Sequence, residues 1–162
     1  MALSTFVGQN LGAHKHDRVK KGVGFAIACS CIMAELIGIC SYIFAPKLIA
    51  IFNDTPEVIA FGSQHTRTMC LFYCMLAFSH CMAAIMRGAG KATVPMVTML
   101  ACWCLLRVTY ITIAVRFVNQ LTTVSWAYPL TWTCSSIIFL IYYLKADWIH
   151  TFDRLEAQGK TA

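Results

Sequence analysis

The sequence is short of charge: Asp, Glu, Lys and Arg make up only 12% of its 162 residues. Soluble domains carry about 25% charged residues. In their place, 59% of the residues are hydrophobic, and the mean hydropathy is +0.65. These apolar residues form long runs rather than a stripe with a 3.6-residue period, which is the pattern of helices surrounded by lipid. The composition excludes a soluble domain and indicates an all-α integral membrane protein.

Motifs of several functional classes are also lacking. The sequence has no CxxC pair, no GxxxxGK[ST] phosphate loop, and no Ser, His and Asp set within reach of one another. Residues 1–22 carry their charges after the apolar part, the reverse of a secretory signal peptide. The basic run "KHDRVKK" has no basic domain around it, which argues against nucleic-acid binding. We therefore expect no enzyme activity, no cofactor, no structural metal and no nucleic-acid partner.

Four apolar runs are long enough to cross a bilayer, which takes about 20 residues. They lie at about 23–44, 60–86, 95–118 and 124–144. The first should stop at Pro46 and Lys47, and the second should have an interfacial start because its first third is polar. Residues 1–12 are apolar but too short to cross. The prediction is a polytopic bundle of four transmembrane helices and an N-terminal half-helix within residues 1–148, followed by a tail at 149–162.

Lysine and arginine are unevenly divided between the two sides of these spans. Nine fall on one side: Lys15, Arg18, Lys20, Lys21, Arg87, Lys91, Lys145, Arg154 and Lys160. Three fall on the other, namely Lys47, Arg67 and Arg116, and Arg107 lies inside a span. The positive-inside rule then predicts that the first side and the C-terminus face the cytoplasm of a cell membrane.

Two opposite charges inside the spans are expected at the same depth. Glu35 follows Val23, and Arg107 follows Pro95, each by about 18 Å of helical rise from a cytoplasmic helix start. A charge in mid-bilayer needs a partner or a water-filled cavity. We predict that Glu35 and Arg107 form an intramembrane ion pair or share a cavity. The pair could fix helix packing, or the carboxylate could couple protonation or ion occupancy to transport; separate partners are the remaining alternative.

Other polar groups in the spans are less strongly indicated as functional residues. His80 lies about 10 Å inside the cytoplasmic end at Arg87, where a histidine can shuttle protons or bond a neighbouring carbonyl. At the outer end of that helix, we expect His65 and Arg67 to meet water or headgroups. Ser135 and Ser136 should make small polar contacts between helices.

The connection "RGAGK" (87–91) carries two glycines at a helix end. Gly88 and Gly90 can take left-handed backbone angles, which would let the chain turn sharply between antiparallel helices.

Several blocks together resemble the multidrug and toxic compound extrusion (MATE) family, with most likeness to its bacterial DinF-like or NorM-like members. They are "FVGQNLGA" (6–13) leading into "KHDRVKKGV" (15–23), "RGAGK" (87–91), "WAYPLTWT" (126–133) and "IYYLKADW" (141–148). The blocks have the family's order and spacing. The positions that carry its cytoplasmic loop motifs are Gly8, Gln9, Asn10, Gly12, Arg87, Gly88 and Gly90.

The resemblance implies a transporter larger than this chain. Family members have about twelve helices in two six-helix lobes, with a central site between them. They export organic cations and other xenobiotics, driven by inward Na⁺ or H⁺ flow. Residues 1–162 resemble the end of the second lobe, so Met1 is expected to be an internal residue and the chain a fragment that is inactive alone. Its partners would then be lipid, the missing N-terminal lobe and small organic cations.

The sequence departs from the family at one place that matters for coupling. Some members have a carboxylate in the helix that ends in RGAG, whereas this chain has no Asp or Glu between Val58 and Met86. The coupling group would then lie in the missing lobe or at Glu35. Two other readings stay open: a non-transporting four-helix membrane protein that binds other helices, and a small homo-oligomeric transporter that uses Glu35.

Overall fold

The computed structural model describes residues 2–117, 121–150 and 153, and this part of the chain is helical. The helices are α1 (Ala2–Gly12), α2 (His16–Ala50), α3 (Pro56–Cys70), α4 (Tyr73–Gly88), α5 (Thr93–Met99), the π-helix η1 (Leu100–Leu106), α6 (Arg107–Phe117) and α7 (Leu121–Lys145). α5, η1 and α6 follow one another without a break, so Thr93–Phe117 forms one long rod. The predicted tail at 149–162 lies mostly outside the described residues, as do Arg154 and Lys160.

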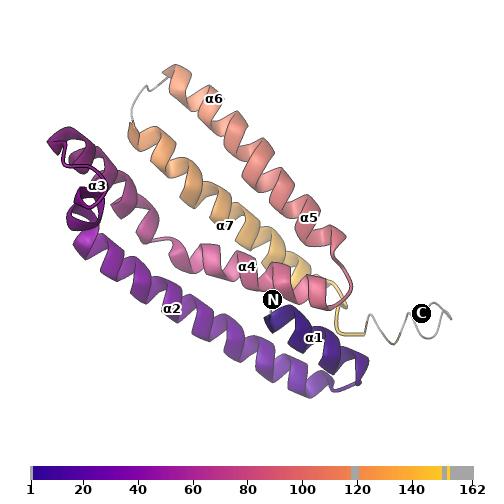
Figure 1. The fold of residues 1–162 in the computed structure, drawn as a ribbon. Helices are drawn as coiled ribbons and strands as arrows, with labels where there is room; N and C mark the ends of the chain where they lie inside the picture. Colours follow the sequence, from indigo (N-terminus) through magenta and orange to yellow (C-terminus); the bar gives the residue numbers. More distant parts are fainter. Residues whose placement is uncertain (1, 118–120, 151–152, 154–162) are drawn as a thin grey trace.

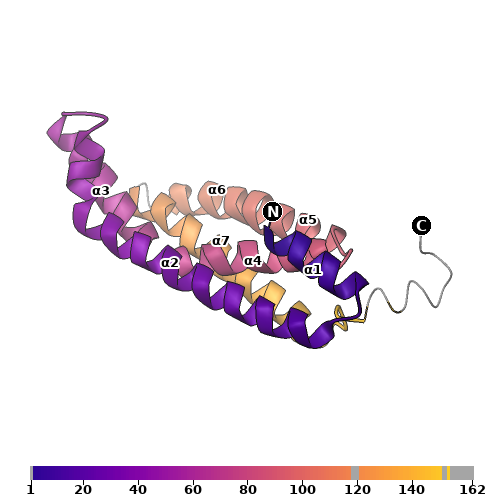
Figure 2. The same ribbon diagram turned by 60° about the horizontal axis from the view of Figure 1, so that its bottom comes forward.

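The long helices lie side by side (Figures 1 and 2). α2 packs on α3 and α4, α4 packs on α7, and α7 packs on η1 and α6. α4 and α7 therefore stand between α2 and the α5–α6 rod. The short α1 lies against α2 and α4 at one end of the bundle.

The predicted spans correspond to these rods. Within residues 2–117 and 121–150, three helical stretches are long and apolar enough to cross a membrane: His16–Ala50, Thr93–Phe117 and Thr122–Lys145. The pair α3 and α4 makes a fourth if it is counted as one span, although it is bent by 54° at its break. The fold is thus an all-α membrane helix bundle, with α1 as the predicted half-helix.

Pro46 and Lys47, where the first span is predicted to stop, do not end the helix, because α2 continues through them to Ala50. A proline inside a helix has no N–H to give to the carbonyl four residues earlier. That carbonyl belongs to Tyr42, and it accepts a hydrogen bond from Arg67 Nε on α3 at 3.4 Å. The Arg67 guanidinium also lies 5.4 Å from the centre of the Tyr42 ring. A side chain from the next helix therefore replaces the missing backbone donor and lets α2 pass the proline.

A compact apolar core joins α1 to the ends of α2, α4 and α7. Its fully or nearly fully buried residues are Val7, Leu11, Val19, Val23, Met82, Ala83, Ile85, Met86, Ala89, Phe139 and Trp148. Gly88 permits this contact: a Cβ there would lie 2.5 Å from the Ser4 carbonyl oxygen and 2.8 Å from Val7 Cβ. Gly88 belongs to helix α4, so its predicted left-handed angle is wrong and its use is close packing.

Gly90 does take the left-handed angle, with φ of 77°. The Gly90 N–H bonds the Arg87 carbonyl, and the Lys91 N–H bonds the Met86 carbonyl. These two bonds define a Schellman motif that ends α4. The other family-motif positions, Gly8, Gln9, Asn10 and Gly12, lie in α1 rather than in a loop, and Asn10 donates to the Phe6 carbonyl within that helix.

Candidate functional site: a broken helix beside an aromatic cavity

The span formed by α3 and α4 is interrupted at Leu71 and Phe72. Such a break leaves the first N–H groups of α4 without partners in their own helix. One of them, Cys74 N–H, donates to Glu35 Oε2 on α2 at 3.3 Å. The Glu35 carboxylate therefore lies at the positive end of the α4 dipole, where negative charge is stabilised.

The side of α2 that carries Glu35 packs closely against the break between α3 and α4. Gly38, one turn further along α2, brings the helix so close that a Cβ would lie 2.6 Å from the Cys70 carbonyl oxygen. Cys31, one turn before Glu35, places its Sγ 3.7 Å from the Cys74 carbonyl oxygen. One side of α2 therefore contacts the break between α3 and α4, through Cys31, Glu35 and Gly38.

A cavity of about 480 Å³ opens beside this break, between α2 and α7. Its lining comprises Ala34, Ile37, Met69, Tyr73, Leu76, Ala77, His80, Tyr128 and Trp132. Trp132 connects two of the aromatic rings, because its ring centre lies 6.2 Å from that of Tyr73 and 6.0 Å from that of Tyr128. No acidic or permanently charged side chain is in the lining. The cavity is therefore an aromatic pocket whose lining includes one imidazole, that of His80.

Arg107 contacts α7 at the aromatic wall of this cavity. Its Nη2 donates to Thr131 Oγ1 at 2.9 Å, and its guanidinium carbon lies 4.4 Å from the centre of the Tyr128 ring and 5.9 Å from that of Trp103. Its Nε is buried and has no hydrogen-bond partner in the described part of the chain. Arg107 directly follows the π-helix η1, and such helices are frequent at functional sites.

Hydrogen bonds between serines connect α4 to α7, and Ser135 and Ser136 make the contacts between helices that were predicted for them. The Ser79 hydroxyl lies 2.8 Å from that of Ser135 and 3.0 Å from that of Ser136. Ser136 also donates to the Met75 carbonyl at 2.9 Å. The cluster is buried, so each hydroxyl must be satisfied by its neighbours, and it fixes the two helices in register.

The structure does not join Glu35 to Arg107. In the part of the chain that it describes, Glu35 bonds the α4 backbone, Arg107 bonds α7, and no ion pair links them. Depth along the helix axis was predicted from the sequence, but the lateral order of helices was not, and α4 and α7 lie between the two residues. Of the alternatives given for Glu35 and Arg107, the structure therefore shows the one in which each residue has its own partner.

The structure also shows the surroundings of the two predicted histidines, His80 and His65. His80 bonds no carbonyl among the described residues; its ring meets Trp103 edge to face at 5.3 Å and borders the cavity. His65 is half-buried rather than solvated, with its Nδ1 2.6 Å from Ser125 Oγ. The break and the π-helix were missed, because no Gly or Pro marks residues 71–72 or 100–106.

Comparison with known proteins identifies the family. The family model described as MatE matches residues 1–113. A probable multidrug resistance protein YpnP of Bacillus subtilis (strain 168) is 25% identical over 147 residues, which cover 91% of this chain and 33% of the relative. A probable multidrug resistance protein NorM of Thermotoga maritima is 27% identical over 104 residues, which cover 64% of this chain and 22% of the relative. The chain thus spans a third or less of the length of these curated relatives. The match covers more than half of the sequence and agrees with the membrane bundle described above, so the chain belongs to the MatE family of membrane transporters.

Proposed function

We propose that this chain contributes helices to a cation-driven multidrug antiporter, in which inward Na⁺ or H⁺ flow drives export of organic cations or other xenobiotics. The observation that carries the proposal is the aromatic cavity between α2 and α7, with Tyr73, Tyr128 and Trp132 in its wall. Aromatic faces attract organic cations within about 6 Å of the ring centre. The relatives described above are named as probable multidrug resistance proteins, which supports the same class of substrate.

Binding of tetraphenylphosphonium to the purified chain in lipid nanodiscs tests the cavity. Tyr73→Leu removes a ring face from the wall, whereas Tyr73→Phe keeps the face and loses only the hydroxyl. We expect Tyr73→Leu to weaken binding by about twofold to thirtyfold and Tyr73→Phe to leave it nearly unchanged, because a cation–π contact is worth about 0.5–2 kcal/mol.

Phe61→Leu provides the matched control, since Phe61 is exposed on α3 and is not part of the cavity lining. The cavity is refuted as the site if the chain fails to bind the cation, or if Phe61→Leu weakens binding as much as Tyr73→Leu.

We further propose Glu35 as the coupling residue. An ionisable group inside a membrane span marks an ion or proton path by default, and half-helix ends in transporters lie at such sites. Glu35 meets both descriptions at the start of α4. Glu35→Gln keeps a side-chain oxygen to accept the Cys74 N–H, so a purely structural role predicts little change in helix content or transport. A coupling role predicts loss of ion-driven transport in proteoliposomes made with the whole transporter.

The corresponding control is Glu57→Gln, which changes an exposed acid in the first turn of α3. Coupling through Glu35 is excluded if Glu35→Gln and Glu57→Gln transport equally well under an imposed ion gradient. We also propose a cell-membrane location with the basic end of the bundle in the cytoplasm, because the lysine and arginine residues gather there.

A further inference from the structure

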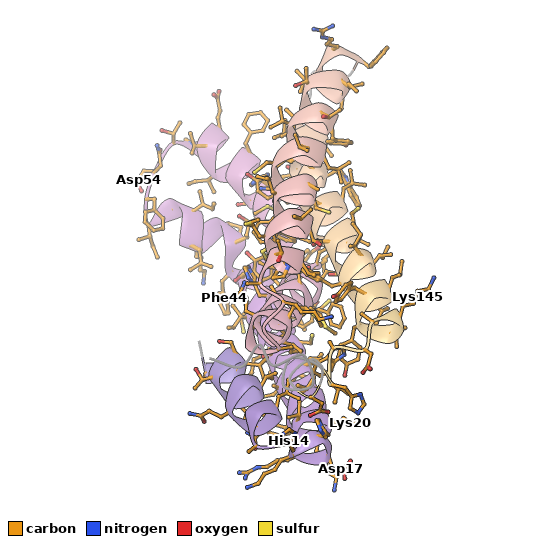
Figure 3. All side chains as sticks on the ribbon, turned by 90° about the vertical axis from the view of Figure 1, so that its right-hand side faces the viewer. His14, Asp17, Lys20, Phe44, Asp54 and Lys145 are labelled. Atoms are coloured by element: carbon orange, nitrogen blue, oxygen red, sulfur yellow. The ribbon has the colours of Figure 1, made fainter. Side chains whose placement is uncertain are left out.

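Histidine and aspartate side chains gather at the end of the bundle away from the α2–α3 connection (Figure 3). His14 comes from the turn between α1 and α2, His16 is the first residue of α2, and Asp153 follows α7 in the sequence. The ligand atoms of these three side chains all lie within 4.8 Å of one another. The proposed transport function uses none of these three residues, which are brought together from opposite ends of the sequence; His16 lies within the family block "KHDRVKKGV", whereas His14 and Asp153 lie outside the family blocks.

The carboxylate of Asp153 lies between the two imidazoles. Asp153 Oδ1 lies 2.7 Å from His14 Nδ1, and Asp153 Oδ2 lies 3.5 Å from His16 Nε2. His16 Nδ1 is buried and has no hydrogen-bond partner among the residues that the structure describes. The second nitrogen of His16 thus lacks the bond that a purely structural histidine would be expected to make.

A further histidine lies next to this group. The ring centre of His150 is 5.2 Å from that of His16. His150 Nδ1 lies 2.6 Å from Asp147 Oδ1, which fixes the ring and leaves Nε2 as the other nitrogen. A carboxylate that orients a histidine in this way is the usual second partner of metal-binding histidines.

The backbone at His14 gives independent support. The His14 N–H bonds the Leu11 carbonyl, and the Lys15 N–H bonds the Asn10 carbonyl. This is the same Schellman motif that Gly90 completes after α4, and His14 holds the position of Gly90 with φ of 54°. Glycine fits this position without the steric cost that a side chain brings, so His14 adopts a backbone conformation that is less favourable for a side-chain-bearing residue.

We propose that His14, His16 and Asp153 form a binding site for a divalent transition metal, with Zn²⁺ as the ion that fits best. Imidazole and a single carboxylate are ligands of Zn²⁺, whereas Ca²⁺ and Mg²⁺ prefer all-oxygen sets. In a tetrahedral zinc site, ligand atoms lie about 3.3 Å apart, given bond lengths near 2.0–2.1 Å. The ligand atoms lie within 4.8 Å of one another, and none of the three side chains is fully buried, so metal binding would require the side chains to rotate closer together. His150 is adjacent to supply a fourth ligand.

Bound metal would fasten the segment after α7 to the α1–α2 turn. His14 and Asp153 are 139 positions apart in the sequence, so the ion would close a loop that includes all of the long helices. Linking residues so distant restricts the unfolded chain strongly.

Titration of the untagged chain in nanodiscs with ZnCl₂, followed by calorimetry, tests the site. We expect one Zn²⁺ per chain, and at least tenfold weaker binding in His14→Gly, His16→Gln and Asp153→Asn. His14→Gly is the sharpest of these, because it relieves the turn and keeps the fold while removing a ligand. The matched controls are Lys15→Gln and Asp17→Asn, which change exposed neighbours of the two histidines and should leave the affinity within about twofold.

Cobalt absorption provides the second readout. Co²⁺ bound by imidazole and carboxylate lacks the intense near-ultraviolet band of a cobalt thiolate, so the spectrum separates this site from the nine cysteines. The proposal is overturned if the chain fails to bind Zn²⁺ at about 1 mM, if the spectrum shows thiolate ligation, or if Asp17→Asn weakens binding as much as Asp153→Asn.

Discussion

Single glycines decide how closely the helices of this bundle approach. At Gly88 an added Cβ would meet the Ser4 carbonyl oxygen and Val7 Cβ of α1, whereas at Gly24 it would meet nothing within 4 Å. We expect Gly88→Ala to destabilise the chain by about 1–3 kcal/mol, because the obstacle includes backbone that cannot rotate away. Gly24→Ala should be neutral or stabilise by up to about 1 kcal/mol through better helix propensity.

Unfolding of both variants in mixed micelles, followed by loss of helical circular dichroism, measures this difference. Equal stabilities of Gly88→Ala and Gly24→Ala would contradict the close contact between α1 and α4.

The separation of Glu35 from Arg107 has a thermodynamic consequence. The two side chains have different partners, Cys74 N–H for Glu35 and Thr131 with Tyr128 for Arg107. Substitutions at sites without shared partners add within about 0.3–0.5 kcal/mol. We therefore expect the unfolding free-energy changes of Glu35→Gln and Arg107→Gln to sum to that of the double variant. A double variant more stable than that sum would restore the ion pair that the sequence suggested.

At the scale of the element, α2 depends on a residue of another helix. Arg67 supplies the donor that Pro46 cannot, by bonding the Tyr42 carbonyl. Pro46→Ala restores a backbone N–H for that carbonyl, so the arginine should then matter less. We expect Arg67→Met to cost about 1–2 kcal/mol in the native background and less than about 0.5 kcal/mol in the Pro46→Ala background.

A double-mutant cycle on unfolding free energies measures this coupling. If Arg67→Met costs the same in both backgrounds, the bond to Tyr42 does not compensate for the proline.

The helices show which features of the fold can be predicted from the sequence and which cannot. Apolar runs and their lengths located the spans, because the requirement to cover a bilayer is a property of the sequence alone. The helix through Pro46 and the break at Leu71 were not predictable from local preference. Proline usually interrupts a helix, yet Arg67 compensates for it; residues 71–72 carry no breaking residue, yet α2 provides a carboxylate at Glu35 and space at Gly38 for an interruption.

The candidate site was predictable only in part for the same reason. Its ionisable members, Glu35, Arg107 and His80, were visible because charges and histidines are rare in apolar runs. The aromatic wall was not, because Tyr73, Tyr128 and Trp132 come from different helices that only packing brings together. The pairing of Glu35 with Arg107 failed at the same step, since position along a helix does not tell which helix lies beside it.

At the scale of the whole molecule, the bundle is only partly covered by its own helices. Within the hydrophobic windows of α2 and of the α5–α6 rod, only 11% of each is buried, against 44% for α7. Large apolar side chains such as Phe25 and Leu105 are about two-thirds to three-quarters exposed there. α7 is thus an inner helix, as α4 is, and the outer faces of α2 and α5–α6 require lipid or further helices around them.

The two ends of the bundle differ in charge, which determines the expected orientation. His14, Asp17 and Lys20 lie at one end, with Lys145 toward it, and Asp54 lies far from them near the α2–α3 connection (Figure 3). Because the starts of α2 and the ends of α4 and α7 carry most of the lysine and arginine, we expect that end to face the cytoplasm. Fusion of green fluorescent protein after Lys145 should fluoresce, and fusion of alkaline phosphatase after Asp54 should be active, because each reporter works on only one side of a bacterial membrane. Exchange of the two reporters should silence both fusions. A fluorescent fusion after Asp54 together with active phosphatase after Lys145 would reverse the orientation, and the basic end would then have to be held outside by interactions stronger than the positive-inside preference.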